Sequence, residues 1–125
     1  MPGLVRDLMT IGVPVCHDTE TGAVVAARLT RQTPAAEVVV VLDEDGMACG
    51  WARAVDLAAQ PDQPVSAVMD EAIPQVPPDI PAQAAAQLLR DRGVAYAFLM
   101  HDWPGEPRPS AMIALKTLEA YLEHA

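Results

Sequence analysis

Arg53 and Asp56 carry side chains that can bind anions and hydroxyl groups. They lie three positions apart in Gly50-Trp51-Ala52-Arg53-Ala54-Val55-Asp56. A guanidinium group presents a planar fork of donors that fits a phosphate. An ionised carboxylate has enough acceptor capacity for two hydroxyl groups. The alternatives are an ordinary surface ion pair for Arg53 and a solvated helix charge for Asp56.

The other polar residues indicate neither catalysis nor a metal centre. No Ser/His/Asp arrangement has a supportive spacing, and no Gly-rich phosphate loop is present, so we expect no enzymatic activity. The three histidines share no ligand spacing with Cys16 and Cys49, so we expect no metal. Two cysteines make no disulfide framework and are typical of small buried thiols.

The composition is that of a folded, acidic domain. Of 125 residues, 51% are hydrophobic and 20% are charged, and the formal net charge is −9, which argues against partners such as nucleic acid or anionic membranes. A small anionic ligand held by local basic groups, such as the sole lysine Lys116, stays compatible with it. No apolar stretch reaches the roughly 18 residues that span a bilayer. The N-terminus also lacks the basic-then-apolar order of a secretory signal, so we expect a cytoplasmic protein.

A repeated order of elements must position these residues. Val5 to Met9 recurs as Val65 to Met69, and each copy precedes an extended stretch, an Ala-rich helical segment, an apolar run, a turn, a second strand and a closing helix. One such unit usually cannot bury its own apolar face and needs its sibling. We therefore expect a closed pair of repeats, divided as 1–60 and 61–125.

Local patterns predict the elements of each repeat. The β-branched run over residues 38–42 indicates a strand buried on both faces. A helix is predicted after the first extended stretch of the chain and runs to about residue 32. Thr19 or Thr21 can cap the start of this helix. Pro81 and Gly93 suit the start and end of a later helix. The predicted fold class is α/β: two β-α-β-β-α repeats related by an approximate two-fold axis, each with a small mixed sheet flanked by helices.

These ordered motifs resemble the CBS domain (named for cystathionine β-synthase), whose tandem pair is often called a Bateman module. The resemblance rests on Val-x-x-Leu/Val-Met, Asp-Thr before an Ala-rich helix, Asp-Glu-Asp-Gly after an apolar strand, and Gly-hydrophobic-x-x-x-x-Asp-Leu; it covers about residues 5–122. It implies a regulatory module that binds an adenosine-containing ligand (AMP, ADP, ATP or S-adenosylmethionine) in a cleft between the repeats. It also implies a regulated partner protein, which we expect to be a separate, unidentified chain.

The resemblance implies roles for individual residues. In the family, an Asp of the closing-helix motif accepts hydrogen bonds from both ribose hydroxyls, and a Thr or Ser three positions earlier meets phosphate with nearby basic groups. Asp56 matches the ribose position, whereas Arg53 replaces the Thr or Ser and either strengthens phosphate binding or fills the cleft. The second copy has Ala114 and Thr117 at these positions, so its ribose carboxylate is lost, although Lys116 lies beside it.

Apolar and aromatic residues would enclose the base. Ile11, Val13 and Val15 are candidates for the base pocket, with simple core packing as the alternative. Trp51 and Trp103 are candidates for stacking on a base. The alternatives are a core or interface position for Trp51 and a surface-covering position for Trp103.

Two function hypotheses stay open. Arg53 and Asp56 favour a ligand-sensing regulatory module. Ala114 and Thr117 favour a degenerate CBS pair that acts as a dimerisation or protein-interaction module without binding nucleotide. Apolar residues beyond one inward stripe of the closing helices also predict a homodimer built from helix faces. These residues are Val55, Leu57, Ala58, Leu115, Leu118, Tyr121 and Leu122.

Overall fold

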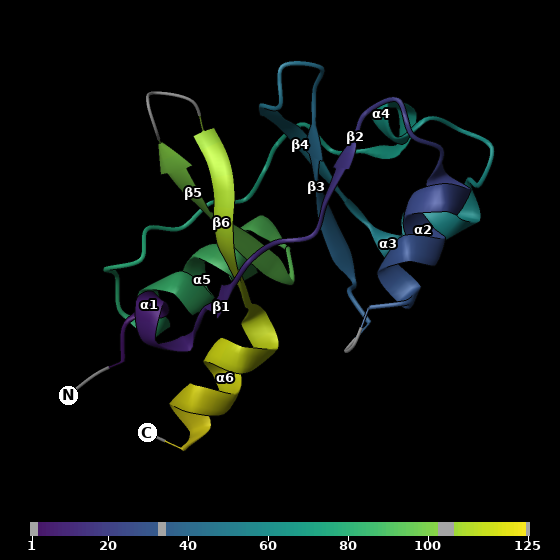
Figure 1. Ribbon diagram of the computed structural model, residues 1–125. Helices are drawn as coiled ribbons and strands as arrows, with labels where there is room; N and C mark the ends of the chain where they lie inside the picture. The colour runs from purple at the N-terminus through teal and green to yellow at the C-terminus, as the bar shows by residue number, and fades with distance from the viewer. Residues whose placement is uncertain (1–2, 33–34, 103–106, 125) are drawn as a thin grey trace.

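Two small sheets, each with helices packed against it, make up the computed structural model, which describes residues 3–32, 35–102 and 107–124 (Figure 1). The first half of the chain contains α1 (Val5–Leu8), β1 (Thr10–Ile11), β2 (Val15–His17), α2 (Gly22–Thr30), β3 (Val38–Leu42), β4 (Ala48–Arg53) and α3 (Ala54–Ala59). The second half contains α4 (Val65–Val68), α5 (Ala82–Arg92), β5 (Tyr96–Asp102), β6 (Pro107–Ala114) and α6 (Leu115–Glu123). The predicted α/β fold with tandem repeats is confirmed.

Both sheets have the same strand arrangement. In one, β2 runs parallel to β3 and β3 runs antiparallel to β4. In the other, β5 runs antiparallel to β6, and residues 73–77, predicted to be extended, contribute the parallel bridge Gln75↔Phe98. Each return strand also pairs with a lead-in segment from the other half. Strand β6 pairs with β1, and β4 pairs with the segment after α4 through the bridge Trp51↔Asp70. Two mixed sheets of equivalent order follow, as the repeat predicts.

The two lead-in helices pack on the core of the opposite half. Val5 of α1 is fully buried in a cluster with residues of α5, β5, β6 and α6, and Val65 of α4 is fully buried in a cluster with residues of β2, β3, α2 and α3. The Val5 amide donates to the Ile80 carbonyl at 3.0 Å, and the Val65 amide donates to the Glu20 carbonyl at 2.8 Å. This exchange interlocks the two halves of the sequence.

The β-branched run in β3 is buried on both faces, as its composition predicts. Val39 and Val41 pack in the cluster beneath α2 and α3, whereas Val38 and Val40 pack with Trp51 and other residues of a second cluster between the two sheets. All four valines are at most 1% exposed. The interior between the sheets therefore joins the halves into one structure.

Backbone carbonyls, rather than a side-chain cap, complete the start of α2. Thr21 occupies the N-cap position, but its side chain makes no capping hydrogen bond. The amides of Gly22 and Ala23 instead donate to the carbonyls of Gln63 and Pro61, at 2.9 and 3.0 Å. The predicted role of Thr19 or Thr21 as a hydrogen-bonding cap is therefore wrong, because the linker between the repeats already satisfies these donors.

The hairpin of the second repeat is longer than its sequence indicates. A Pro-rich loop is predicted over residues 101–109, but β5 and β6 continue until Asp102 pairs with Pro107. A register shift between Leu99 and Met100 accompanies the extension. The end of α5 follows its sequence signal, because Gly93 takes the left-handed conformation there at φ 67°.

Candidate functional site

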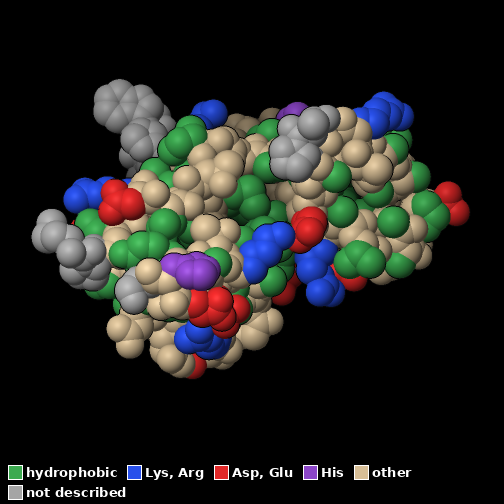
Figure 2. All heavy atoms as spheres, turned by 90° about the horizontal axis from the view of Figure 1, so that it is seen from below, with side chains coloured by type: hydrophobic (Ala, Val, Ile, Leu, Met, Phe, Trp, Pro, Cys, Tyr) green, Lys and Arg blue, Asp and Glu red, His purple; other side chains and the backbone are tan. Residues whose placement is uncertain are grey.

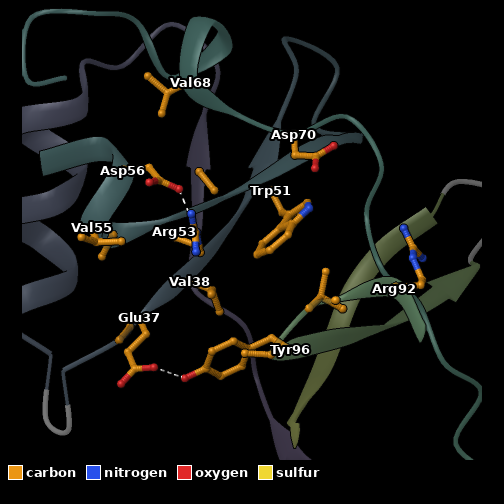
Figure 3. A pocket seen from close by; sticks show the side chains of 16 residues that line it. Glu37, Val38, Trp51, Arg53, Val55, Asp56, Val68, Asp70, Arg92 and Tyr96 are labelled. Atoms are coloured by element: carbon orange, nitrogen blue, oxygen red, sulfur yellow. Dashed lines mark hydrogen bonds and ion pairs between the residues drawn. The ribbon is translucent and has the colours of Figure 1, made fainter. Parts of the chain in front are cut away.

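A cleft of about 790 Å³ lies between the two halves where β4 passes into α3 (Figure 3). We call it the first cleft. Its lining includes Trp51, Arg53 and Asp56 from this junction, together with Glu37, which precedes β3, and Tyr96, the first residue of β5. The structure thus places three of the residues predicted for the binding site together around one space.

Arg53 and Asp56 are bound to each other at the edge of the first cleft. The Arg53 Nε atom donates a hydrogen bond to Asp56 Oδ2 at 2.8 Å. Arg53 ends β4 in an extended conformation, and Asp56 lies in the first turn of α3, so the strand-to-helix junction brings the two side chains together. Both side chains are substantially exposed, at 58% and 43%. Solvent screening makes such a pair weak, so a ligand can replace it at low cost.

Trp51 forms a wall of the first cleft and is also part of the core. It is 8% exposed, and its indole N–H donates to the Ala72 carbonyl at 3.2 Å. Its ring lies tilted against Phe98, with ring centroids 6.1 Å apart. The core position suggested for Trp51 is confirmed. A ring held in this way offers a rigid aromatic surface to a ligand.

Tyr96 and Glu37 join the two repeats beside the cleft. The Tyr96 hydroxyl donates a hydrogen bond to the Glu37 carboxylate (Figure 3). Burial and this carboxylate raise the pKa of Tyr96 to about 12, so the hydroxyl keeps its proton at neutral pH. Sequence reasoning missed this pair, because Glu37 precedes a strand and Tyr96 falls within an apolar run.

A second cleft of about 710 Å³ shares this wall. It is lined by Val13, Lys116 and Thr117, together with the same Glu37 and Tyr96. It is the structural counterpart of the first cleft, at the junction of β6 and α6. Thr117 occupies the position equivalent to Asp56 and brings no carboxylate. This cleft can offer an ammonium group and hydroxyls, but no carboxylate at the position that the resemblance assigns to ribose.

The other predicted base-pocket residues lie in different surroundings. Val13 is half-buried and lines the second cleft, whereas Val15 is 42% exposed and belongs to the lining of neither cleft. Ile11 lines the second cleft but is 75% exposed. Core packing is therefore wrong for Ile11 and Val15. In β2 only Cys16 points inward, because successive strand residues face opposite sides. Trp103 lies outside the described residues.

Two further charged residues of the first cleft were not singled out from the sequence. Asp70 follows α4, and Arg92 ends α5. The Asp70 carboxylate accepts from the Ala72 amide at 2.8 Å, and the Arg92 guanidinium donates to the Ala72 carbonyl at 3.4 Å. Neither lies in the closing-helix motif, so only the fold brings them to the cleft.

Among the described residues outside the two clefts, the charged side chains visible in Figure 2 and the two thiols give no indication of another site. Basic and acidic side chains are interspersed over the face in Figure 2 and gather in no patch of one sign. Among the described residues, no group of three or more His, Cys, Asp and Glu could hold a metal ion. No described helix is long and apolar enough to cross a bilayer.

Burial raises the pKa of the Cys16 thiol to about 12, which makes this cysteine a poor nucleophile.

Comparison with known proteins identifies the fold. No protein-family model and no curated protein matches the sequence. Solved structures do match it. One is the CBS domain pair of protein MJ0100, in complex with 5′-methylthioadenosine and S-adenosyl-L-methionine, at TM-score 0.83 and 16% identity over 99% of this chain and 98% of that one. Another is CBSX2 in complex with AMP, at TM-score 0.74 and 17% identity over 97% of both chains.

A third similarity involves a larger protein. The cytosolic domain of the Mg²⁺ channel MgtE, in complex with ATP, matches at TM-score 0.75 and 23% identity over 91% of this chain. Only 46% of the MgtE chain is covered, so this protein spans about half of its length. The three similarities agree with the architecture described above, which has two equivalent mixed sheets and exchanged lead-in segments. The chain has the fold of a CBS-domain pair.

Proposed function

We propose that this chain is a regulatory CBS pair that binds an adenosine-containing ligand in the first cleft and signals its presence to a separate partner protein. The candidate ligands are AMP, ADP, ATP and S-adenosylmethionine. The observation that carries the proposal is the Arg53–Asp56 pair, 2.8 Å apart, at the edge of a cleft of about 790 Å³. Clefts of this size typically hold small ligands and cofactors.

Three residues of the first cleft have distinct roles under this proposal. Asp56 accepts hydrogen bonds from the two ribose hydroxyls, and Arg53 turns from Asp56 towards an anionic group of the ligand. The pair must separate for this, and ligand bonds then replace the 2.8 Å contact. Trp51 provides an aromatic wall for the ligand. Three similar structures were solved with adenosine-type ligands, which supports the choice of ligand class.

The second cleft has a different part in the proposal. Lys116 and Val13 line it, but Thr117 replaces the ribose carboxylate. We propose that it does not bind ribose as the first cleft does. Val15, which lines neither cleft, has no place in this binding scheme.

Calorimetric titration of the purified chain with AMP, ADP, ATP and S-adenosylmethionine tests the proposal. We expect at least one ligand to bind with one site per chain and to raise the melting temperature as its concentration increases, because a ligand that binds only the folded state stabilises it. Absence of both heat and thermal shift with every ligand at millimolar concentration would overturn the proposal.

A specific observation favours a second function, that of an interaction module without a nucleotide. The second cleft lacks its carboxylate, and Val55 of α3 is 67% exposed. This alternative predicts self-association that no adenosine ligand alters. Stabilisation by any ligand of the panel would count against it. Under either function we propose a cytoplasmic homodimer that meets its partner through helix faces.

A further inference from the structure

The first cleft has more acidic than basic side chains along its described lining. Glu37, Asp56 and Asp70 are acidic, and Arg53 and Arg92 are basic. The Arg92 guanidinium also donates to the Ala72 carbonyl. A chain of phosphates in this cleft would therefore meet three carboxylates and only two guanidinium groups.

The two arginines also do not form a single cluster. Figure 3 shows Arg53 and Arg92 on opposite sides of the Trp51 ring. Strong phosphate sites bring several donors to one group of oxygens, and this arrangement separates them. The aromatic ring between the arginines has the opposite preference, because its face attracts a cation.

We infer that the first cleft selects adenosine ligands that carry a positive charge near the ribose, of the sulfonium class, over adenosine polyphosphates. This inference rests on the proposed function and specifies its ligand. In a sulfonium adenosine such as S-adenosylmethionine, the cationic sulfur is attached to the ribose 5′ carbon. A ribose held at Asp56 therefore places the charge within the same cleft as Trp51 and the carboxylates. The formal net charge of −9 acts in the same direction over longer distances.

The amino-acid portion of such a ligand also finds complementary groups. Its carboxylate can bind the guanidinium group of Arg53 once that group leaves Asp56. Its ammonium group can bind Glu37, whose carboxylate already accepts one hydrogen bond from Tyr96 and has acceptor capacity left. ATP offers no cation to Glu37 and brings further negative charge towards it.

A matched pair of ligands tests the inference. S-adenosylmethionine and S-adenosylhomocysteine differ by one methyl group and the sulfonium charge. We expect calorimetry to give S-adenosylmethionine an affinity about two to thirty times higher, the range of a cation on an aromatic face converted to a ratio. We also expect ATP to bind more weakly than AMP. Added salt should weaken S-adenosylmethionine binding, because it screens the attraction.

A variant locates the source of the selectivity. Glu37→Gln keeps an oxygen that can accept from Tyr96 but removes the charge, so we expect it to reduce the preference for S-adenosylmethionine over ATP about threefold or more. Glu44→Gln, the same change at an exposed position outside both cleft linings, should leave the preference unchanged. Should Glu37→Gln fail to fold by circular dichroism, Asp70→Asn provides the same test.

The outcomes separate the inference from the proposed function. Equal affinity for the sulfonium and sulfide ligands, tighter binding of ATP, or an unchanged preference in the folded charge variant would overturn the inference and leave nucleoside binding intact. If none of AMP, ADP, ATP and S-adenosylmethionine binds, both the inference and the proposed function are overturned.

Discussion

Tyr96 donates a hydrogen bond to Glu37 across the boundary between the two repeats, and both residues line both clefts. The backbone on each side of this bond is tied to a closing helix. The Ala54 amide donates to the Glu37 carbonyl, and the Leu115 amide donates to the Ala95 carbonyl, each at 2.8 Å. The starts of α3 and α6 are thus connected through one side-chain hydrogen bond.

The free energy of unfolding should depend on pH in the alkaline range because of Tyr96. The pKa of Tyr96 rises from 10.0 to about 12 in the folded protein, through burial and Glu37. Between these two pH values the Tyr96 hydroxyl keeps its proton in the folded state but loses it in the unfolded state. The free energy of unfolding should therefore fall as pH rises from about 10 to about 12. Cys16, raised from 9.0 to about 12, extends the decline to lower pH. Urea unfolding of Tyr96→Phe should show a shallower decline; an identical slope would contradict the assignment to Tyr96.

Replacement of Asp56 tests the binding geometry. Asp56→Ala removes the acceptor for two ribose hydroxyls, and hydrogen bonds to a charged group contribute about 1.5–3 kcal/mol each. We expect the calorimetric affinity for AMP to fall at least about tenfold. Asp62→Ala, at an exposed linker position, is the control and should bind as the unmodified protein does. An unchanged dissociation constant in Asp56→Ala would remove this residue from the site.

Replacement of Leu57 tests the packing of α3. Leu57 is fully buried, although the sequence allowed it an outward position. Leu57→Ala leaves a cavity, so the free energy of unfolding in urea should fall by about 2–5 kcal/mol. Leu88→Ala makes the same change in α5 at a residue that is 44% exposed, and it should cost less than about 1 kcal/mol. Equal losses for the two variants would show that α3 is not packed as described.

Self-association is the fourth prediction. Among the apolar residues of the closing helices, Leu57 and Leu118 are buried, whereas Val55, which also lines the first cleft, is 67% exposed. Exposed apolar helix surface of this kind is usually covered, so light scattering at micromolar concentration should return twice the 13.3 kDa mass of the chain. Val55→Glu should shift the mass towards the monomer, but Val15→Glu, on an exposed strand position, should not. A monomer mass for the unmodified chain would refute the homodimer.

Local sequence patterns determined most of the elements. The β-branched run over residues 38–42 forms β3, and Pro81 and Gly93 mark the start and the end of α5, as predicted. The recurrence of Val5 to Met9 at Val65 to Met69 indicated two equivalent units, and the two sheets confirm them. The strand and helix-end signals are reliable because each depends on residues within a few positions of one another, where strand alternation and helix ends are decided.

Only the tertiary structure decided which distant residues meet. Glu37 and Tyr96 are 59 positions apart, and their bond requires the starts of β3 and β5 to lie together. Exposure of Ile11 and Val15 depends on which strands lie at a sheet edge. Sequence spacing brought Arg53 and Asp56 close, but the 2.8 Å contact between them comes from the turn between β4 and α3. Such contacts arise when the two halves pack, and no local pattern records the partner that packing supplies.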